Sequence, residues 1–110
     1  MRIHHVALRT LDLERLERFY GTVLEFAVLR RDAERGSVWL DAGGAILMLE
    51  RAEPGEPAIS EESKELLAFA VDDKEAWRSR VRVEGETAHT LYFRDPDGRR
   101  LAVSSYVFRP

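Results

Sequence analysis

The first half of the chain opens with HVALRTLD (residues 5–12), and the second half opens with LLAFAVDD (residues 66–73). Each segment is a short apolar run that ends in aspartate, a pattern typical of a strand leading to the N-cap of a helix. Each half then ends with two apolar runs around a turn, GG at residues 43–44 and DPDG at residues 95–98. The 110-residue chain therefore carries one β-α-β-β-β module twice.

The first module is predicted to contain one helix at residues 13–24, because apolar residues recur through it at helical spacing and Asp12 stands at its N-cap position. The Gly-Gly pair at 43–44 predicts a two-residue hairpin, which places Trp39 opposite Met48. The strands of this module are expected at residues 3–10, 26–31, 38–41 and 45–50.

A composition break, RAEPGEPAISEESK at residues 51–64, separates the two modules. The second module is predicted to have a shorter helix at residues 73–81, capped by Asp72 or Asp73, where Asp72 and Glu75 resemble a capping box. Its strands are expected at residues 66–71, 81–84, 89–94 and 99–106. We expect one domain, residues 1–110, with modules at 1–52 and 64–110 and a linker at 53–63.

Composition excludes several classes of function. A net charge of −3 without a basic stripe argues against nucleic acid as a partner. The absence of cysteine excludes disulfides, thiolate zinc sites and cysteine nucleophiles. No apolar run approaches the roughly 18 residues of a membrane helix, and the first residues lack the apolar core of a signal peptide. We therefore expect a cytoplasmic protein with no membrane partner.

Three motifs in order carry a resemblance to a known family. They are HVAL at residues 5–8, the segment from Asp12 to Phe26, and YFRDPDG at residues 92–98. The chain resembles the vicinal-oxygen-chelate superfamily, which includes glyoxalase I, bleomycin-resistance proteins, fosfomycin thiol transferases and extradiol dioxygenases. The resemblance implies an α+β fold in which two βαβββ modules form a cup-shaped mixed β-sheet with the helices outside. One departure is Glu25, where the family has glycine after the helix, and it implies a modified helix exit or mild strain.

The resemblance also implies four metal-ligand positions in the cup, one on each of four strands. They fall on His5, Met48, Leu66 and Ala102. Only His5 has the side chain of a family ligand, whereas a hard or borderline divalent cation needs about four nitrogen or oxygen donors. We therefore expect no metal of the family type and no cofactor. A second interpretation of His5 is a structural, buried or half-buried histidine that is hydrogen-bonded to a neighbouring residue.

Strand alternation predicts which side chains face the cup. Two inward arginines, Arg9 and Arg100, favour an anionic ligand; the alternative is that both sit in water at the strand ends. The candidate ligand-binding residues are His5, Arg9, Trp39, Met48, Leu66, Thr90, Tyr92, Arg100, Ala102 and Ser104.

Apolar walls with few polar groups are typical of a small-molecule site. The sequence therefore predicts a homodimeric protein that binds a small organic molecule, anionic or aromatic, by sequestration as bleomycin-resistance proteins do. No catalytic residues can be assigned from spacing. Two alternatives stay open: a metal-dependent lyase, isomerase or dioxygenase, and a dimeric interaction module with a collapsed cup.

Overall fold

The computed structural model describes residues 1–109, and the chain divides into two compact units, Met1–Pro57 and Ala58–Pro110. The division falls within the segment that the sequence predicts as a linker. Each unit has one four-stranded mixed sheet and its own helical segment, in the order strand, helix, three strands. The predicted α+β fold of two βαβββ modules is thereby confirmed.

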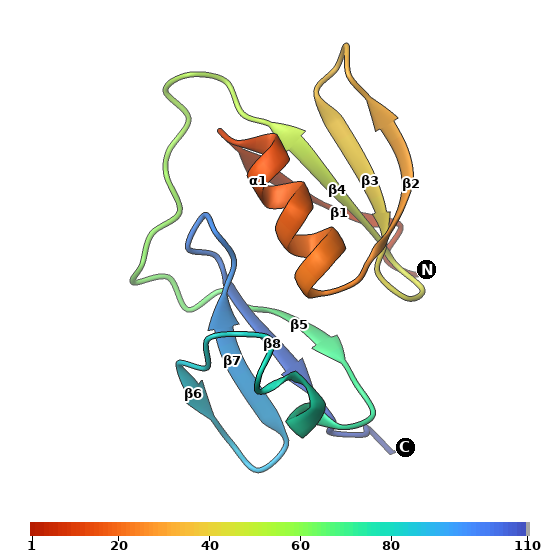
Figure 1. Ribbon diagram of the computed structural model, residues 1–110, viewed down its shortest axis with the longest axis vertical. Helices are drawn as coiled ribbons and strands as arrows, with labels where there is room; N and C mark the ends of the chain where they lie inside the picture. Colours follow the sequence, from red (N-terminus) through yellow and green to blue (C-terminus); the bar gives the residue numbers. More distant parts are fainter. Residues whose placement is uncertain (110) are drawn as a thin grey trace. The chain divides into compact units, whose positions relative to one another are not determined.

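The first sheet has the strand order β1-β4-β3-β2, in which β1 and β4 are parallel and the other neighbours are antiparallel. Figure 1 shows helix α1 lying across one face of this sheet. The parallel pair of β1 and β4 arises because the chain crosses over through the helix and the β2–β3 hairpin before β4 returns beside β1. The elements are β1 His5–Thr10, α1 Leu13–Arg18, η1 Phe19–Val23, β2 Ala27–Asp32, β3 Ser37–Asp41 and β4 Ile46–Arg51.

The helix of the first unit begins where the sequence predicts, but it changes type in the middle. The Asp12 carboxylate accepts a hydrogen bond from the backbone N–H of Arg15 at 3.1 Å, which satisfies one orphan donor of the first turn. After Arg18 the helix widens into a π-helical turn, a feature that often marks functional regions. The π-helical turn ends at Val23 with Leu24 as its C-cap, and Glu25 follows with a φ of 60° in the left-handed region. The left-handed exit suited to glycine is therefore kept, and of the two expectations for Glu25 the structure supports mild strain.

The β3–β4 hairpin has the predicted two-residue turn. The backbone N–H of Ala42 donates to the carbonyl of Ala45 at 2.9 Å, and both intervening glycines have positive φ. This register places Trp39 opposite Met48, as predicted. The β2–β3 pair is less regular, because a bulge at Leu29 shifts its register between Val28 and Arg30.

The second sheet repeats the topology with the order β5-β8-β7-β6. Its elements are β5 Leu67–Ala70, η2 Lys74–Trp77, β6 Gly85–Glu86, β7 Thr90–Arg94 and β8 Arg100–Ser104. Between β7 and β8, the buried Asp95 carboxylate accepts hydrogen bonds from the backbone N–H groups of Asp97 and Arg99 and pairs with the Arg99 guanidinium at 2.6 Å. This network makes the DPDG segment a fixed turn.

Two predictions for the second unit are wrong. The helix expected at 73–81 is a single 3₁₀ turn at Lys74–Trp77, and its cap is Asp73, whose carboxylate accepts from the N–H of Glu75. No strand forms at 81–84; the short strand is β6 at 85–86. The 3₁₀ turn buries no residue completely, so hydrophobic packing does not extend it. Instead, Lys74 and Arg78 both pair with Glu86, at 3.3 and 2.8 Å, which ties the turn to β6.

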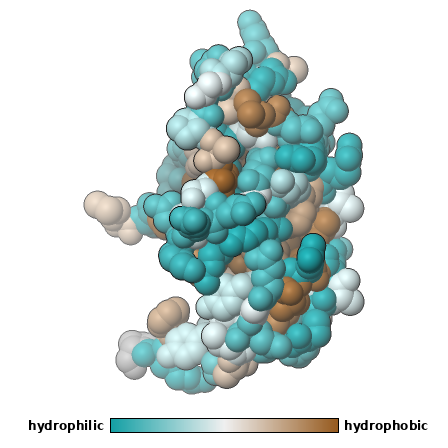
Figure 2. Space-filling model, turned by 90° about the vertical axis from the view of Figure 1, so that its left-hand side faces the viewer, coloured by the Kyte–Doolittle hydropathy of each residue, from teal (hydrophilic) through white to brown (hydrophobic). Residues whose placement is uncertain are grey.

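Alternation along the strands separates a buried face from an open face in each sheet. The buried face of the first sheet contains Leu8, Leu47 and Leu49, and that of the second contains Leu91, Phe93, Leu101 and Val103. Figure 2 shows a mainly hydrophilic surface on which hydrophobic side chains form small separate patches. Throughout residues 1–109, no helix is long and apolar enough to cross a membrane.

Candidate functional site

The open face of the first sheet, opposite α1, brings together residues from all four strands. In one row across the sheet, Ala7, Met48, Trp39 and Arg30 lie side by side. In the next row the neighbours are Arg9, Glu50, Ser37 and Asp32. An apolar row therefore lies beside a polar row, which gives this face both a surface for packing and groups for hydrogen bonding.

A pocket of about 350 Å³ opens on this face, and we call it the Trp39 pocket. Met48, which is 9% exposed, and the half-buried Trp39 form its apolar part. The His5 ring contacts the Trp39 ring edge-on, with centroids 5.2 Å apart. Its lining residues are Arg30, Asp32, Arg35, Ser37, Trp39, Met48 and Glu50.

Arg9 lies on the same face but is held by carboxylates. Its guanidinium donates to Glu50 at 2.5 Å and forms a two-bond pair with Glu56 at 3.0 and 2.6 Å. The backbone N–H of Glu53 also donates to Glu56. The hydrogen bonds from Arg9, followed by the one from Glu53, lower the pKa of Glu56 from 4.5 to about 2, and the two glutamates raise the pKa of Arg9. The Arg9–Glu56 pair thus fastens the segment after β4 to strand β1.

The open face of the second sheet is paired internally in a similar way. The Arg100 guanidinium lies over the Tyr92 ring, 4.7 Å from its centroid, and the Thr90 hydroxyl donates to the Ser104 hydroxyl at 2.8 Å. Ala102 is fully buried between these groups in the sheet. This face offers an aromatic ring with a stacked cation and a pair of hydroxyls.

The four positions at which the family implies metal ligands do not fit a metal site. Met48 and Leu66 are apolar, Leu66 is 42% exposed, and Ala102 has no donor atom beyond its backbone. The fourth, His5, has its Nδ1 only 2.8 Å from the Nδ1 of His4, in hydrogen-bond contact. Within residues 1–109, no three His, Cys, Asp or Glu side chains gather in a way that could hold a metal ion.

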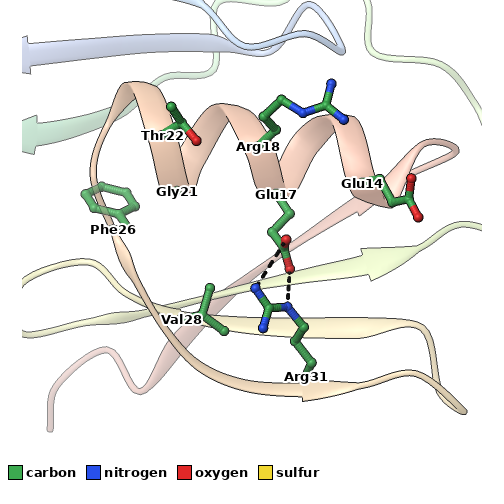
Figure 3. Close-up of a pocket in the computed structure, with 8 residues that line it drawn as sticks. All are labelled: Glu14, Glu17, Arg18, Gly21, Thr22, Phe26, Val28 and Arg31. Atoms are coloured by element: carbon green, nitrogen blue, oxygen red, sulfur yellow. Dashed lines mark hydrogen bonds and ion pairs between the residues drawn. The ribbon is translucent and has the colours of Figure 1, made fainter.

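A second pocket, of about 510 Å³, lies on the other side of the first sheet, between the helix and β2. Figure 3 shows Glu17 reaching from the helix toward Arg31 on β2, with Thr22, Phe26 and Val28 beyond them. The Glu17 and Arg31 side chains form an ion pair at 2.8 Å, which raises the pKa of Arg31. This ion pair joins the helix to the sheet. The two charged groups are paired with each other across the pocket.

The candidate ligand-binding residues predicted from the sequence lie in both units of the chain. Of those on the first sheet, Trp39 and Met48 line the Trp39 pocket, and His5 and Arg9 lie beside it. Leu66, Thr90, Tyr92, Arg100, Ala102 and Ser104 belong to the second unit.

Five residues that line the Trp39 pocket are not among the candidates drawn from the sequence: Arg30, Asp32, Arg35, Ser37 and Glu50. Arg30 was not among the candidates because of the bulge at Leu29. Strict alternation from Val28, which pairs with the helix-side Leu40, assigns Arg30 to the helix side as well; the extra residue turns it to the open face. No signal in the sequence marks this bulge.

Three solved structures share this fold at low sequence identity. Fosfomycin resistance protein FosX from Mesorhizobium loti is 18% identical, with a TM-score of 0.79 over 97% of this chain and 93% of that chain. Lactoylglutathione lyase from Agrobacterium tumefaciens is 22% identical, with a TM-score of 0.73 over 94% and 92%. The antibiotic-binding protein TnmS3 from a Streptomyces species is 22% identical, with a TM-score of 0.74 over 94% of both chains. At such identities the likeness shows the fold alone.

The sequence comparisons place the chain in a family without identifying a close relative. No curated protein matches the sequence. The sequence pattern of the Glyoxalase/Bleomycin resistance protein/Dioxygenase superfamily, in contrast, matches residues 2–103, nearly the whole chain. The two βαβββ modules, the DPDG turn and this match lead to one conclusion: the chain belongs to the glyoxalase/bleomycin resistance protein/dioxygenase superfamily.

Proposed function

We propose that the chain binds a small planar organic molecule in the Trp39 pocket, by sequestration and without a metal of the family type. The observation that carries this proposal is the pocket itself, about 350 Å³ with an indole and a thioether on one side and polar groups on the other. Small-molecule sites have volumes of roughly 300–1,000 Å³ and combine apolar walls with a few orienting polar groups.

The apolar part of the pocket suits an aromatic ligand. A planar ring can pack against Trp39, and the Met48 sulfur can contact the ring edge. Ser37 and Glu50 supply hydrogen-bonding groups that orient the ligand in the plane of that contact. We further propose that the open face of the second sheet, with Tyr92 and the hydroxyl pair of Thr90 and Ser104, is by itself a separate contact surface for small molecules.

Sequestration is favoured over catalysis by the side chains at the ligand positions. A binding protein needs neither a metal nor a nucleophile, and the side chains of Met48, Leu66 and Ala102 supply no nitrogen or oxygen donor for a divalent cation of the family type. TnmS3, which has the same fold, is described as an antibiotic-binding protein. The alternative function is a metal-dependent lyase, isomerase or dioxygenase. It is supported by the shared fold of a lactoylglutathione lyase.

Elemental analysis separates the two functions. Protein purified without an affinity tag is expected to contain no stoichiometric divalent metal. Stoichiometric zinc, nickel, manganese or iron, lost on His5→Ala substitution, would favour the metal-dependent enzyme and contradict the proposal.

Ligand binding is tested by thermal unfolding in the presence of aromatic acids, aromatic amides and cationic antibiotics. A ligand present at about 100 times its Kd stabilises the folded state by about 2.7 kcal/mol, which raises Tm by several degrees. We expect this rise for the wild type and for Phe108→Ala, a control that removes an exposed aromatic residue of the second unit. Trp39→Ala should abolish the rise and Trp39→Phe should retain part of it. A rise of equal size in Trp39→Ala would place binding elsewhere.

A further inference from the structure

We propose that one end of the Trp39 pocket, formed by Arg30, Arg35 and Ser37, recognises an anionic group, so that the ligand is a planar molecule with a single carboxylate. The inference rests on the proposed function and deepens it by naming the ligand class. It reassigns the recognition of the acid from the two arginines that the sequence nominated, Arg9 and Arg100, to two that it did not.

The register of the β2–β3 hairpin brings the three residues to one end of the pocket. Arg30 lies opposite Trp39, and Asp32 lies opposite Ser37, on the same face. Arg30 is therefore a diagonal neighbour of Ser37, at a separation of roughly 7–8 Å along the backbone (somewhat less between the Cβ atoms), which a long side chain can span. Arg35 lies in the turn joining the two strands and lines the same pocket.

Ser37 is the most informative of the three residues. It is only 5% exposed, yet its hydroxyl forms no hydrogen bond with any side chain or backbone group of the described residues. The hydroxyl oxygen itself is not enclosed by protein atoms, so it is accessible from the pocket. Because Ser37 lines the pocket, an oxygen of a bound ligand can supply the missing acceptor.

Arg30 and Arg35 differ from Arg9 and Arg31, whose guanidinium groups are paired with carboxylates. Arg9 is held by Glu50 and Glu56, and Arg31 by Glu17. The Arg30 and Arg35 guanidinium groups pair with no carboxylate among residues 1–109. They are therefore available to form charge-assisted hydrogen bonds with an incoming carboxylate.

The acidic residues of the pocket do not cancel this preference. Glu50 is bonded to Arg9, which it shares with Glu56, so the charge of Glu50 is partly offset. Asp32 accepts a hydrogen bond from the backbone N–H of Arg35, and its single negative charge stands against two guanidinium groups. The two guanidinium groups at this end of the pocket have no carboxylate partner in the described residues, so both can donate to one carboxylate of a ligand.

The test compares two probes of nearly equal shape, indole-3-carboxylate and the neutral indole-3-carboxamide, by isothermal titration calorimetry. We expect the wild type to bind the carboxylate at least ~10-fold more tightly, the lower end for a hydrogen bond to a charged group. Arg30→Gln combined with Arg35→Gln should remove this preference by lowering the affinity for the carboxylate to about that for the carboxamide. Ser37→Ala should weaken carboxylate binding several-fold. The matched control is Arg82→Gln, which neutralises an exposed arginine of the second unit.

Failure of the inference and failure of the proposed function give different results. Equal affinity for both probes, lost together in Trp39→Ala, would overturn the anionic subsite and leave the proposed function standing. A carboxylate preference that survives in the Arg30→Gln, Arg35→Gln protein would also overturn the subsite. Binding of neither probe, or binding unaffected by Trp39→Ala, would overturn the proposed function and the subsite with it. Thermal unfolding of each variant without ligand shows whether it is folded.

Discussion

Replacing Glu25 by glycine should stabilise the protein, because Glu25 adopts a conformation that suits glycine. Its φ is 60°, and it is the one non-glycine residue with positive φ in the described part of the chain. The backbone cannot relax easily at this point. The N–H of Leu24 donates to the carbonyl of Phe19 at 3.3 Å, and the N–H of Phe26 donates to the carbonyl of Tyr20 at 3.0 Å, so both neighbours of Glu25 are held.

The expected size of the effect follows from two opposing terms. The left-handed conformation costs a non-glycine residue about 1–2 kcal/mol. Glycine loses more backbone entropy on folding than other residues, and this loss reduces the gain in stability by roughly 0.5–1 kcal/mol. The net stabilisation should be about 0.5–1 kcal/mol, equivalent to a rise in Tm of roughly 2–6 °C for a domain of this size.

The assay is urea denaturation and scanning calorimetry of the wild type, Glu25→Gly and Glu25→Ala. The alanine variant removes the same charge and side-chain interactions but keeps the left-handed strain, so it isolates the backbone term. Glu25→Gly should be more stable than Glu25→Ala. The expected difference is the free energy of the left-handed strain minus the cost of ordering the glycine backbone. Equal stability of the two variants would refute the reasoning.

Three further predictions concern the first unit and the assembly. Because pairing with Arg9 lowers the pKa of Glu56 to about 2, the pair stabilises the protein above pH 4.5 and this contribution is lost as the pH falls toward 2. The Tm of Glu56→Gln should therefore fall less than that of the wild type over this range, and parallel profiles would contradict the pairing. Leu16→Ala, at a fully buried position, should lower the free energy of unfolding by about 2–5 kcal/mol, whereas Leu11→Ala, at a 73% exposed position, should change it by less than about 0.5 kcal/mol in urea titrations. We expect a homodimer, so sedimentation equilibrium should give twice the chain mass of 12.6 kDa, and a monomer mass at micromolar concentration would count against it.

Features set by short-range rules could be predicted from the sequence. The Asp12 cap depends on a side chain three residues from its partner, and the Gly-Gly pair at 43–44 determines the hairpin register that places Trp39 opposite Met48. The tandem repeat of these local signals was sufficient for the α+β fold. The second helix was overestimated because the sequence pattern of residues 73–81 does not reveal that the segment buries no side chain completely.

The residues of the candidate site were only partly predictable. Trp39 and Met48 follow from strand alternation, which the sequence shows directly. Arg30 does not, because the bulge at Leu29 reverses the face on which it lies. Ser37 has nothing in its sequence neighbourhood to mark it as a serine whose hydroxyl faces the pocket.

By itself, the sequence determined the modules, their order and the identity of the residues at the family's ligand positions, since these depend on spacing within short segments. The tertiary structure decided which charges are available to a ligand. Arg9 is paired with Glu56, 47 residues away, whereas Arg30 and Arg35 pair with no carboxylate in the part of the chain that the structure describes. The reason is that a charge-assisted pair depends on distances of about 3 Å between atoms, and only folding brings residues so far apart in the chain to that distance.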